Sequence, residues 1–409
     1  MILVMEHTDL QNRNILISGA SVAGPALAWW LARHGFRPTV VERAPHLRGG
    51  GYAVDFRGAA HLSVLAKMGL LEQIRARQTH LASTTYVDAA GRPTARMPAG
   101  IFAGDVEILR GDLGQILYQA TRDRAEYLFG DSVTSLRQDA DGVHVTFTRA
   151  APRTFDLVIG ADGLHSQVRR LAFDGQPDPV HDLGLYVSIF GVADSFGLDH
   201  SGLLYSVPGK TAAVFSAPGT GQARGGTVAQ FFFTAPESGP IGFDYHDTGQ
   251  QQKILASAFE GVGWHVPALL GQMPEAPDFY FDSVSQVRLD RWSAGRVALI
   301  GDAGYAAGPG GNGTGTAVVA AYVLAGELAA ARGDHRIAFG RYERLLRPYV
   351  ARGQKQARGG RDFLAPATAK KIRQRDRFFA VLPYLPAKGL IRYLSTRTAA
   401  AIKLPEYGG

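Results

Sequence analysis

The sequence predicts an α/β protein that combines a doubly wound parallel sheet, an inserted β-rich domain and C-terminal helices. Two observations support this fold class. Short apolar runs end in glycine or aspartate turns at three distant places, near residues 19, 162 and 302, as the strands of such a sheet do. Residues 181–284 instead carry strand-like segments with many aromatic side chains, which predicts a separate β-rich unit.

Composition limits the possible functions. The chain has 409 residues, of which 46% are hydrophobic, so it can bury a large core in two or three domains. It has no cysteine, which excludes disulfides, thiolate metal sites and cysteine nucleophiles. The N-terminal apolar run is short and acidic residues follow it, which is typical of neither a secretory signal nor a membrane span. We therefore expect a cytoplasmic protein without an integral membrane segment.

The net charge of +7 is unevenly distributed. From residue 341 onwards there are 16 Lys and Arg against 4 Asp and Glu, whereas residues 1–340 carry a net charge of −5. The basic residues recur at helical spacing beside apolar ones, which favours solvated helix faces. A patch for a membrane surface or an anionic partner stays open as the alternative. We expect no nucleic-acid partner.

The first motif predicts a strand, a tight turn and a helix. An apolar run at residues 14–18 leads into the turn Gly19 to Gly24, and an apolar helix follows with Gly35 as its end signal. The next strand ends at Glu42, where a carboxylate can accept hydrogen bonds from an adenosine ribose. This βαβ unit predicts a dinucleotide whose adenosine ribose carries no extra phosphate, such as FAD or NAD. A glycine-capped helix in an ordinary α/β sheet is the alternative.

The turn departs from the usual G-x-G-x-x-G pattern at one position. Ser21 stands where the second glycine belongs, so a bound pyrophosphate must tolerate a small hydroxymethyl group close to the backbone. Ala23 and Gly24 complete the turn at the start of the helix. Because serine is the mildest such change, we still expect binding.

The remaining elements alternate in the same way. A helix is expected at 59–78, a hairpin at 84–97, a helix that begins with Asp112 as its N-cap, and a helix at 317–331. Strands are expected at 126–129, 143–148, 156–160, 185–192, 203–207, 212–216, 228–234 and 296–300.

Together, three motifs resemble the fingerprints of the single-component FAD-dependent aromatic hydroxylases. They are the turn Gly19 to Gly24, the pair Asp162 and Gly163 within residues 156–169, and Gly301 with Asp302 within VALIGDAG. The resemblance covers essentially the whole chain. It is nearest to the bacterial natural-product hydroxylases, with their roles in antibiotic biosynthesis, and to the tetracycline-inactivating monooxygenases.

This resemblance implies a glutathione-reductase-like variant of the Rossmann fold. The expected FAD-binding domain is discontinuous, since the β-rich segments interrupt it. We expect residues 12–80, 100–180 and 285–345 in the FAD-binding domain, residues 81–99 and 181–284 in the β-rich substrate domain, and residues 346–409 in a C-terminal helical segment.

The resemblance also implies residue roles. Asp302 would hydrogen-bond the ribityl chain, Arg110 would contact the FAD phosphates or ribityl chain, and Arg43 would lie near the adenine. Asp162 would hold the structure around FAD, with a further link to NAD(P)H use. A surface arginine and a turn-forming aspartate are the alternative interpretations of Arg110 and Asp162. The predicted cofactor-binding residues are Gly19, Ser21, Ala23, Gly24, Glu42, Arg43, Arg110, Asp162, Gly301, Asp302, Pro309, Gly311, Asn312 and Gly313.

The loop after Asp302 departs most from the family pattern. Tyr305 replaces the usual histidine, and the segment Pro309 to Gly313 is one residue shorter. The backbone amides of Gly311, Asn312 and Gly313 are nevertheless expected to face the isoalloxazine ring. The geometry of this loop bears on the edge of the flavin where oxygen reacts.

The family's chemistry belongs to the cofactor. NADPH or NADH reduces the flavin, oxygen adds at C4a, and the hydroperoxide transfers an oxygen atom to an electron-rich carbon. The resemblance thus implies hydroxylation or epoxidation of an aromatic or polyketide-like small molecule, with no catalytic side chain and no metal. The protein would position the substrate and exclude water. Candidates for the substrate wall, with core packing as the alternative, are Tyr186, Tyr205, Phe215, Phe231 and Phe233.

Two other functions stay open at this point. The altered loop motivates an FAD-containing protein without redox activity, such as a cyclase or a ligand-binding protein of the same fold. A plain NAD-dependent dehydrogenase is a weaker hypothesis, because the two later aspartate motifs argue against it.

Overall fold

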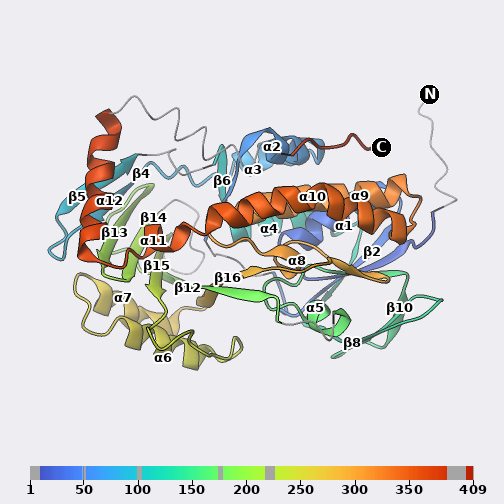
Figure 1. Ribbon diagram of the computed structural model, residues 1–409, viewed down its shortest axis with the longest axis horizontal. Helices are drawn as coiled ribbons and strands as arrows, with labels where there is room; N and C mark the ends of the chain where they lie inside the picture. The colour runs from blue at the N-terminus through green and yellow to red at the C-terminus, as the bar shows by residue number, and fades with distance from the viewer. Residues whose placement is uncertain are drawn as a thin grey trace.

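The structure is a computed structural model that describes residues 10–47, 49, 52–98, 104–173, 178–216, 226–384 and 402–408. Residues 385–401 of the expected C-terminal helical segment lie outside these ranges. Figure 1 shows two lobes, with the parallel sheet on the right and a second large sheet on the left. The helix α10 (His335–Ala357) runs along the right-hand lobe toward the left-hand one.

A parallel sheet forms the centre of the right-hand lobe. Its edge strand β17 pairs antiparallel with β18, and the other neighbours run parallel. Ile15, Leu16 and Ile17 are fully buried, as expected for a parallel sheet covered on both faces. In spatial order its strands are β17 (Ser293–Ala294), β18 (Val297–Leu299), β11 (Leu157–Gly160), β1 (Asn14–Ser18), β2 (Arg37–Glu42) and β7 (Glu126–Phe129).

Helices cover one face of this sheet, where α9 (Gly313–Ala330) packs against both α1 (Ala23–Arg33) and α10. Among the residues that the structure describes, α9 alone is long and apolar enough to cross a membrane. Most of α9 is buried inside the fold, as in the core helix of many proteins. On the other side lie α5 (Gln167–Ala172) and the antiparallel strands β8 (Val133–Gln138), β9 (Val143–Phe147) and β10 (Arg153–Phe155).

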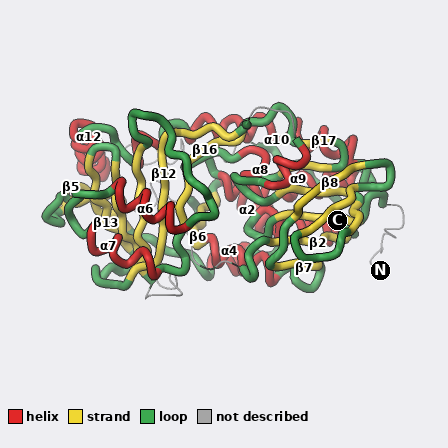
Figure 2. The backbone as a smooth tube through the Cα atoms, turned by 90° about the horizontal axis from the view of Figure 1, so that it is seen from below, coloured by secondary structure: helices red, strands yellow, loops and turns green. Residues whose placement is uncertain are grey.

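The left-hand lobe is built on a mostly antiparallel sheet (Figure 2). Its strands come from three parts of the chain. Its β13 and β4 pair in parallel. One face packs against α6 (Thr248–Ala258), α7 (Val266–Gln272) and the short helix η1 (Met273–Glu275). In spatial order the strands are β16 (Tyr280–Val287), β12 (Val180–Val192), β15 (Thr227–Thr234), β14 (Lys210–Ser216), β13 (Ser201–Val207), β4 (Ser83–Val87) and β5 (Pro93–Pro98).

Smaller elements connect the lobes. Strands β3 (Ala53–Phe56) and β6 (Val106–Leu109) pair antiparallel. The helix expected at 59–78 is two helices, because Gly69 with φ +71° turns the chain between α2 (Gly58–Lys67) and α3 (Leu71–Arg75).

Asp112 is not an N-cap, and that prediction was wrong. The helix α4 (Arg110–Gln119) begins directly after β6, so Leu109 occupies the cap position and Asp112 lies in the first turn. A carboxylate there still interacts favourably with the helix dipole.

The C-terminal elements contact both lobes. Helices α11 (Gly360–Leu364) and α12 (Ala369–Val381), followed by η2 (Leu382–Tyr384), lie beside the left-hand sheet. Arg375 of α12 lies 4.2 Å above the ring of Tyr86 and donates to the Ser206 hydroxyl at 3.2 Å. The basic residues of this segment are therefore not all solvated. The expected boundary after residue 284 falls inside β16, and the expected boundary after residue 345 falls inside α10. The domain boundaries therefore remain a proposal.

Candidate functional site

The three sequence motifs meet at the carboxyl edge of the parallel sheet. Gly19 has φ +110°, and a Cβ there would lie 2.4 Å from the carbonyl oxygen of Ala161, directly before Asp162. Gly301 has φ +64°, and a Cβ there would lie 3.3 Å from the Cβ of Ala23. Because β1, β11 and β18 run parallel and adjacent, their final turns form one surface.

The first turn is held by tight backbone packing and by Glu42. A Cβ on Gly24 would lie 1.9 Å from the carbonyl oxygen of Gly19, so only glycine fits there. The two carboxylate oxygens of Glu42 accept the N–H groups of Ala20 at 2.8 Å and Ala44 at 2.9 Å. A carboxylate oxygen can accept more than one hydrogen bond, so these contacts leave capacity for a ribose hydroxyl.

Ser21 and Arg110 contact each other across this turn. The hydroxyl of Ser21 accepts hydrogen bonds from Nε of Arg110 at 3.2 Å and from Nη2 at 3.0 Å. The guanidinium group also lies 5.8 Å from the centre of the Tyr52 ring. Arg110 is half-buried beside the turn, unlike a surface arginine at a helix end. The serine that departs from the glycine pattern thus has a specific local partner.

Asp302 begins the short helix α8 (Asp302–Tyr305) and its side chain is exposed. Its carboxylate faces the start of α9, since a Cβ on Gly313 would lie 3.6 Å from Oδ1. Although the side chain is exposed, neighbouring protein groups displace part of its water and raise the pKa of Asp302, while the charge of Arg110 lowers it and that of Asp282 raises it. Arg110 and Asp302 therefore share one electrostatic environment at the sheet edge.

Asp162 organises the second turn. Its carboxylate accepts hydrogen bonds from the Ser166 hydroxyl, from the N–H of Gln167 at 2.8 Å and from the N–H of Val168 at 3.0 Å. Burial raises the pKa of Asp162, and these hydrogen bonds lower it. The carboxylate thus accepts hydrogen bonds from the N-terminal amides of α5. This structural role is sufficient to account for an aspartate at position 162.

Arg169 connects the second motif to the third and was missed in the sequence. It is 6% exposed, and its guanidinium donates to the carbonyl oxygens of Ala303 at 2.7 Å and Leu164 at 2.6 Å. Its place inside the DGLHSQVR segment was a usable signal.

Tyr305, which replaces the family's histidine, lies in the core. It is 3% exposed and its hydroxyl is 2.8 Å from that of Tyr342, which donates to the carbonyl oxygen of Leu299 at 3.0 Å. Its ring also lies 4.4 Å from that of Trp292, measured between centroids. Burial raises the pKa of Tyr305, which keeps the phenol neutral. The replacement therefore changes core packing beneath the loop.

The loop itself offers polar groups that fit a flavin. Asn312 has φ +58° and is 8% exposed, and its Nδ2 has no hydrogen-bond partner among the described residues. A buried amide donor without a partner is costly unless a ligand accepts from it. Pro309 is half-buried beside it. A small cavity under the loop is lined by Gly301, Asp302, Tyr305, Ala307, Gly311, Gly313, Thr316 and Val350.

Four of the five aromatic candidates for the substrate wall need correction. They lie in the apolar core between the left-hand sheet and α6 and α7, because they occupy the sheet face that those helices cover. These four side chains are Tyr186, Tyr205, Phe231 and Phe233. Phe215 points to the opposite face, where a Cβ on Gly202 would lie 2.4 Å from its ring, and it is half-buried.

The opposite face approaches the cofactor motifs through β16. Burial raises the pKa of Tyr280, as do Asp282, Tyr52 and Asp302, whereas Arg110 lowers it, so all these groups are within electrostatic reach. Asp282 is 3.0 Å from Nε2 of His165, in the turn after Asp162. Sequence periodicity gave no signal for this contact, because the strand is separated from the turn by more than a hundred residues.

Directly after β2, Nη1 of Arg43 lies 3.0 Å from Nδ1 of His246. The neighbouring Tyr245 stacks on His165 with ring centroids 4.4 Å apart. Both aromatic residues come from the loop before α6, so this loop of the left-hand lobe contacts the right-hand lobe. Arg43 therefore follows β2 of the right-hand lobe and contacts the left-hand lobe through His246.

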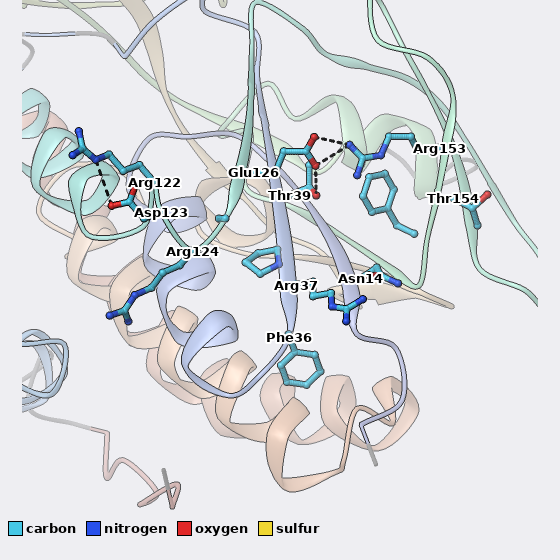
Figure 3. Close-up of a pocket in the computed structure, with 13 residues that line it drawn as sticks. Asn14, Phe36, Arg37, Thr39, Arg122, Asp123, Arg124, Glu126, Arg153 and Thr154 are labelled. Atoms are coloured by element: carbon cyan, nitrogen blue, oxygen red, sulfur yellow. Dashed lines mark hydrogen bonds and ion pairs between the residues drawn. The ribbon is translucent and has the colours of Figure 1, made fainter. Parts of the chain in front are cut away.

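A broad surface hollow of about 650 Å³ lies at the opposite edge of the parallel sheet (Figure 3). Asn14, Arg37 and Glu126 line it at the amino ends of their strands, and Glu126 pairs with Arg153 at 2.8 Å. Since the three motifs lie at the carboxyl ends, this hollow is separate from the candidate site.

Comparison with known proteins agrees with this geometry. Residues 12–185 match the family described as FAD binding domain. A flavin-dependent monooxygenase from an unknown prokaryotic organism is 38% identical over 413 residues, covering 98% of this chain and 100% of the relative. One from Legionella longbeachae is 39% identical over 350 residues, covering 84% and 88%. The crystal structure of tetracycline destructase Tet(51) has a TM-score of 0.84 at 35% identity, covering 96% and 99%.

Proposed function

We propose that this chain uses NADPH or NADH and molecular oxygen to hydroxylate or epoxidise an aromatic or polyketide-like small molecule. The chain belongs to the single-component FAD-dependent aromatic hydroxylase family of monooxygenases. The observation that carries the proposal is the meeting of the turns at Gly19, Asp162 and Asp302 on one sheet edge. A similar solved structure is by name a tetracycline destructase, which supports a fused-ring substrate.

The residues would hold FAD in three places. Glu42 and Arg43 would contact the adenosine, Arg110 the phosphates or ribityl chain, and Asp302 the ribityl chain. When bound, the flavin supplies the redox chemistry, accepting hydride from the nicotinamide and activating oxygen. Asn312 would donate its free amide hydrogen to the ring.

For the substrate, the sheet face opposite α6 and α7 is the better candidate wall. Tyr280 and Phe215 lie on this face and are half-buried, so both can be contacted. The Tyr280 hydroxyl donates to Asp282 at 3.4 Å and would be able to bond a substrate oxygen instead. The lobes would exclude water by closing over the ring between them.

The test is turnover with a defined oxygen source. Purified protein is reconstituted with FAD and screened with tetracyclines and other fused-ring phenols for stimulated oxidation of NADPH and NADH. We expect one compound to stimulate oxidation and to gain one atom from ¹⁸O₂ by mass spectrometry. Asp302→Ala should weaken FAD binding strongly, with Asp290→Ala, an exposed aspartate before β17, as the matched control.

Two outcomes would redirect the proposal. A protein that takes up no FAD contradicts the family's cofactor role, and product formed without oxygen and NAD(P)H supports a non-redox cyclase. The altered loop no longer favours that alternative, because Tyr305 packs in the core. A cytoplasmic location is part of this proposal and is checked by cell fractionation.

A further inference from the structure

Two glutamines, Gln286 fully buried and Gln354 half-buried, hold the loop after Asp302 from opposite sides. Gln286, on β16, is fully buried, and its Nε2 donates to the carbonyl oxygens of Ala307 at 2.8 Å and Gln354 at 2.7 Å. Its Oε1 accepts from Nη2 of Arg288 at 2.6 Å, which fixes the orientation of the amide. The amide donors of Gln286 therefore face the loop.

Gln354, on α10, holds the neighbouring peptide. Its Nε2 donates to the carbonyl oxygens of Ala306 at 3.1 Å and Val287 at 2.8 Å. The N–H of Val287 donates to the same Ala306 oxygen at 3.1 Å. Successive carbonyl groups of the loop are thus bonded to a strand of one lobe and a helix of the other.

The helix also contacts the loop without side chains. A Cβ on Gly353 would lie 2.7 Å from the carbonyl oxygen of Gly311, so α10 and the loop meet backbone to backbone. One turn further, Nε2 of Gln356 donates to the carbonyl oxygen of Gly310 at 3.0 Å. The segment 353–356 of α10 therefore supports the loop over most of its length.

We propose that Gln286 and Gln354 are positioning residues that form an amide clamp on the flavin-facing loop. This rests on the proposed function in one respect, namely that Gly311 to Gly313 face the isoalloxazine ring. Gln286, Tyr280 and Asp282 occupy even positions of β16 and share one face. The clamp therefore connects β16, which is proposed to contact the substrate, with the loop that would surround the flavin.

The clamp is tested with Gln286→Met and Gln354→Met, which keep the side-chain volume and remove the amide donors. Gln252→Met is the matched control, because Gln252 is half-buried like Gln354 and its Nε2 donates to the carbonyl oxygen of Met273 at 3.3 Å, in η1 and away from the loop. We measure the Kd for FAD by fluorescence quenching, the visible spectrum of the bound flavin, and Tm.

We expect each clamp variant to raise the FAD Kd about tenfold and to shift the flavin absorption bands, because the carbonyl group of Ala307 or of Val287 loses its amide donor and the loop is held less firmly. The control should lower Tm while its FAD Kd stays within about twofold of wild type. If the clamp variants behave like the control, the glutamines are structural only and the proposal fails.

A milder variant covers the case in which the methionine variants do not fold. Gln356→Ala removes a single bond to Gly310 from a half-buried side chain, and it should shift the flavin bands in the same direction by less. An unchanged spectrum would contradict the clamp. Failure of the proposed function is recognised separately, because the wild-type protein would then bind no FAD or would form no product labelled from ¹⁸O₂.

Discussion

Two glycine-rich segments border the candidate site, and different forces hold them. The glycine pattern of the turn from Gly19 to Gly24 is required by close backbone approaches, one of them local, since a Cβ on Gly24 would meet the oxygen of Gly19. The loop after Asp302 is held by distant side chains, including Gln286 and Gln354. A motif is therefore readable in sequence when its own backbone supplies the constraint, and much less so when remote residues supply it.

The largest expected effect breaks the local turn. Gly24→Ala places a methyl group 1.9 Å from a backbone oxygen, so we expect a loss of about 3 kcal/mol or more in unfolding free energy and no FAD binding. Gly340→Ala in α10 is the control, because a Cβ there meets nothing within 4 Å and should stabilise by up to ~1 kcal/mol. Urea unfolding and FAD titration measure both. A Gly24→Ala protein that binds FAD normally would show that the turn tolerates a side chain.

The second prediction concerns pH and the support of the distant loop. His61 is fully buried with its ring against Gly315, and it bonds the N–H of Arg57 and the hydroxyl of Tyr349. Burial, with the charge of Arg57, lowers its pKa to about 4. The unfolded chain takes up the proton first, so stability is complete above pH 6.5 and falls by up to about 3 kcal/mol as pH drops toward 4.

Urea unfolding of wild type and His61→Gln between pH 7 and 4.5 tests this sign. The glutamine variant should be less stable at pH 7, and the difference should shrink as pH falls. A difference that stays constant across this range would mean that His61 does not titrate differently in the two states.

A smaller effect is expected at Tyr305. Tyr305→Phe removes one hydrogen bond to Tyr342, which still donates to Leu299, so the cost is about 1 kcal/mol. Tyr342→Phe should cost more, since it leaves the buried Leu299 carbonyl without this donor. The visible spectrum of bound FAD should be unchanged in Tyr305→Phe. A shifted spectrum would show that this side chain affects the flavin directly.

The smallest effect is expected at Ser21. Ser21→Gly restores the family's glycine and removes the acceptor of two hydrogen bonds from the half-buried Arg110. We expect unfolding free energy to change by less than ~1 kcal/mol and FAD affinity to change by only a few-fold, measured by the same titration. A loss of FAD binding would instead make the serine hydroxyl a required part of the turn.

The sequence by itself determined the α/β fold class, the family and the three motifs around Gly19, Asp162 and Asp302. Each motif is a strand followed by a turn, and hydrophobic periodicity and glycine placement depend on neighbours in the chain. The structure brings these motifs together at one sheet edge, in agreement with their predicted proximity. Their contacts with FAD stay predictions.

Only the tertiary structure decided which side chains support those motifs and which face of the inserted sheet is available. Tyr186 and Tyr280 both lie on strands of the same sheet. Helices α6 and α7 cover the face that carries Tyr186, whereas the face that carries Tyr280 is directed toward Asp302. Alternation along a strand separates the two faces without saying which one another element will cover. The roles of Gln286 and Gln354 could not be predicted from the sequence for the same reason, because their hydrogen-bond partners are distant in sequence and close only after folding.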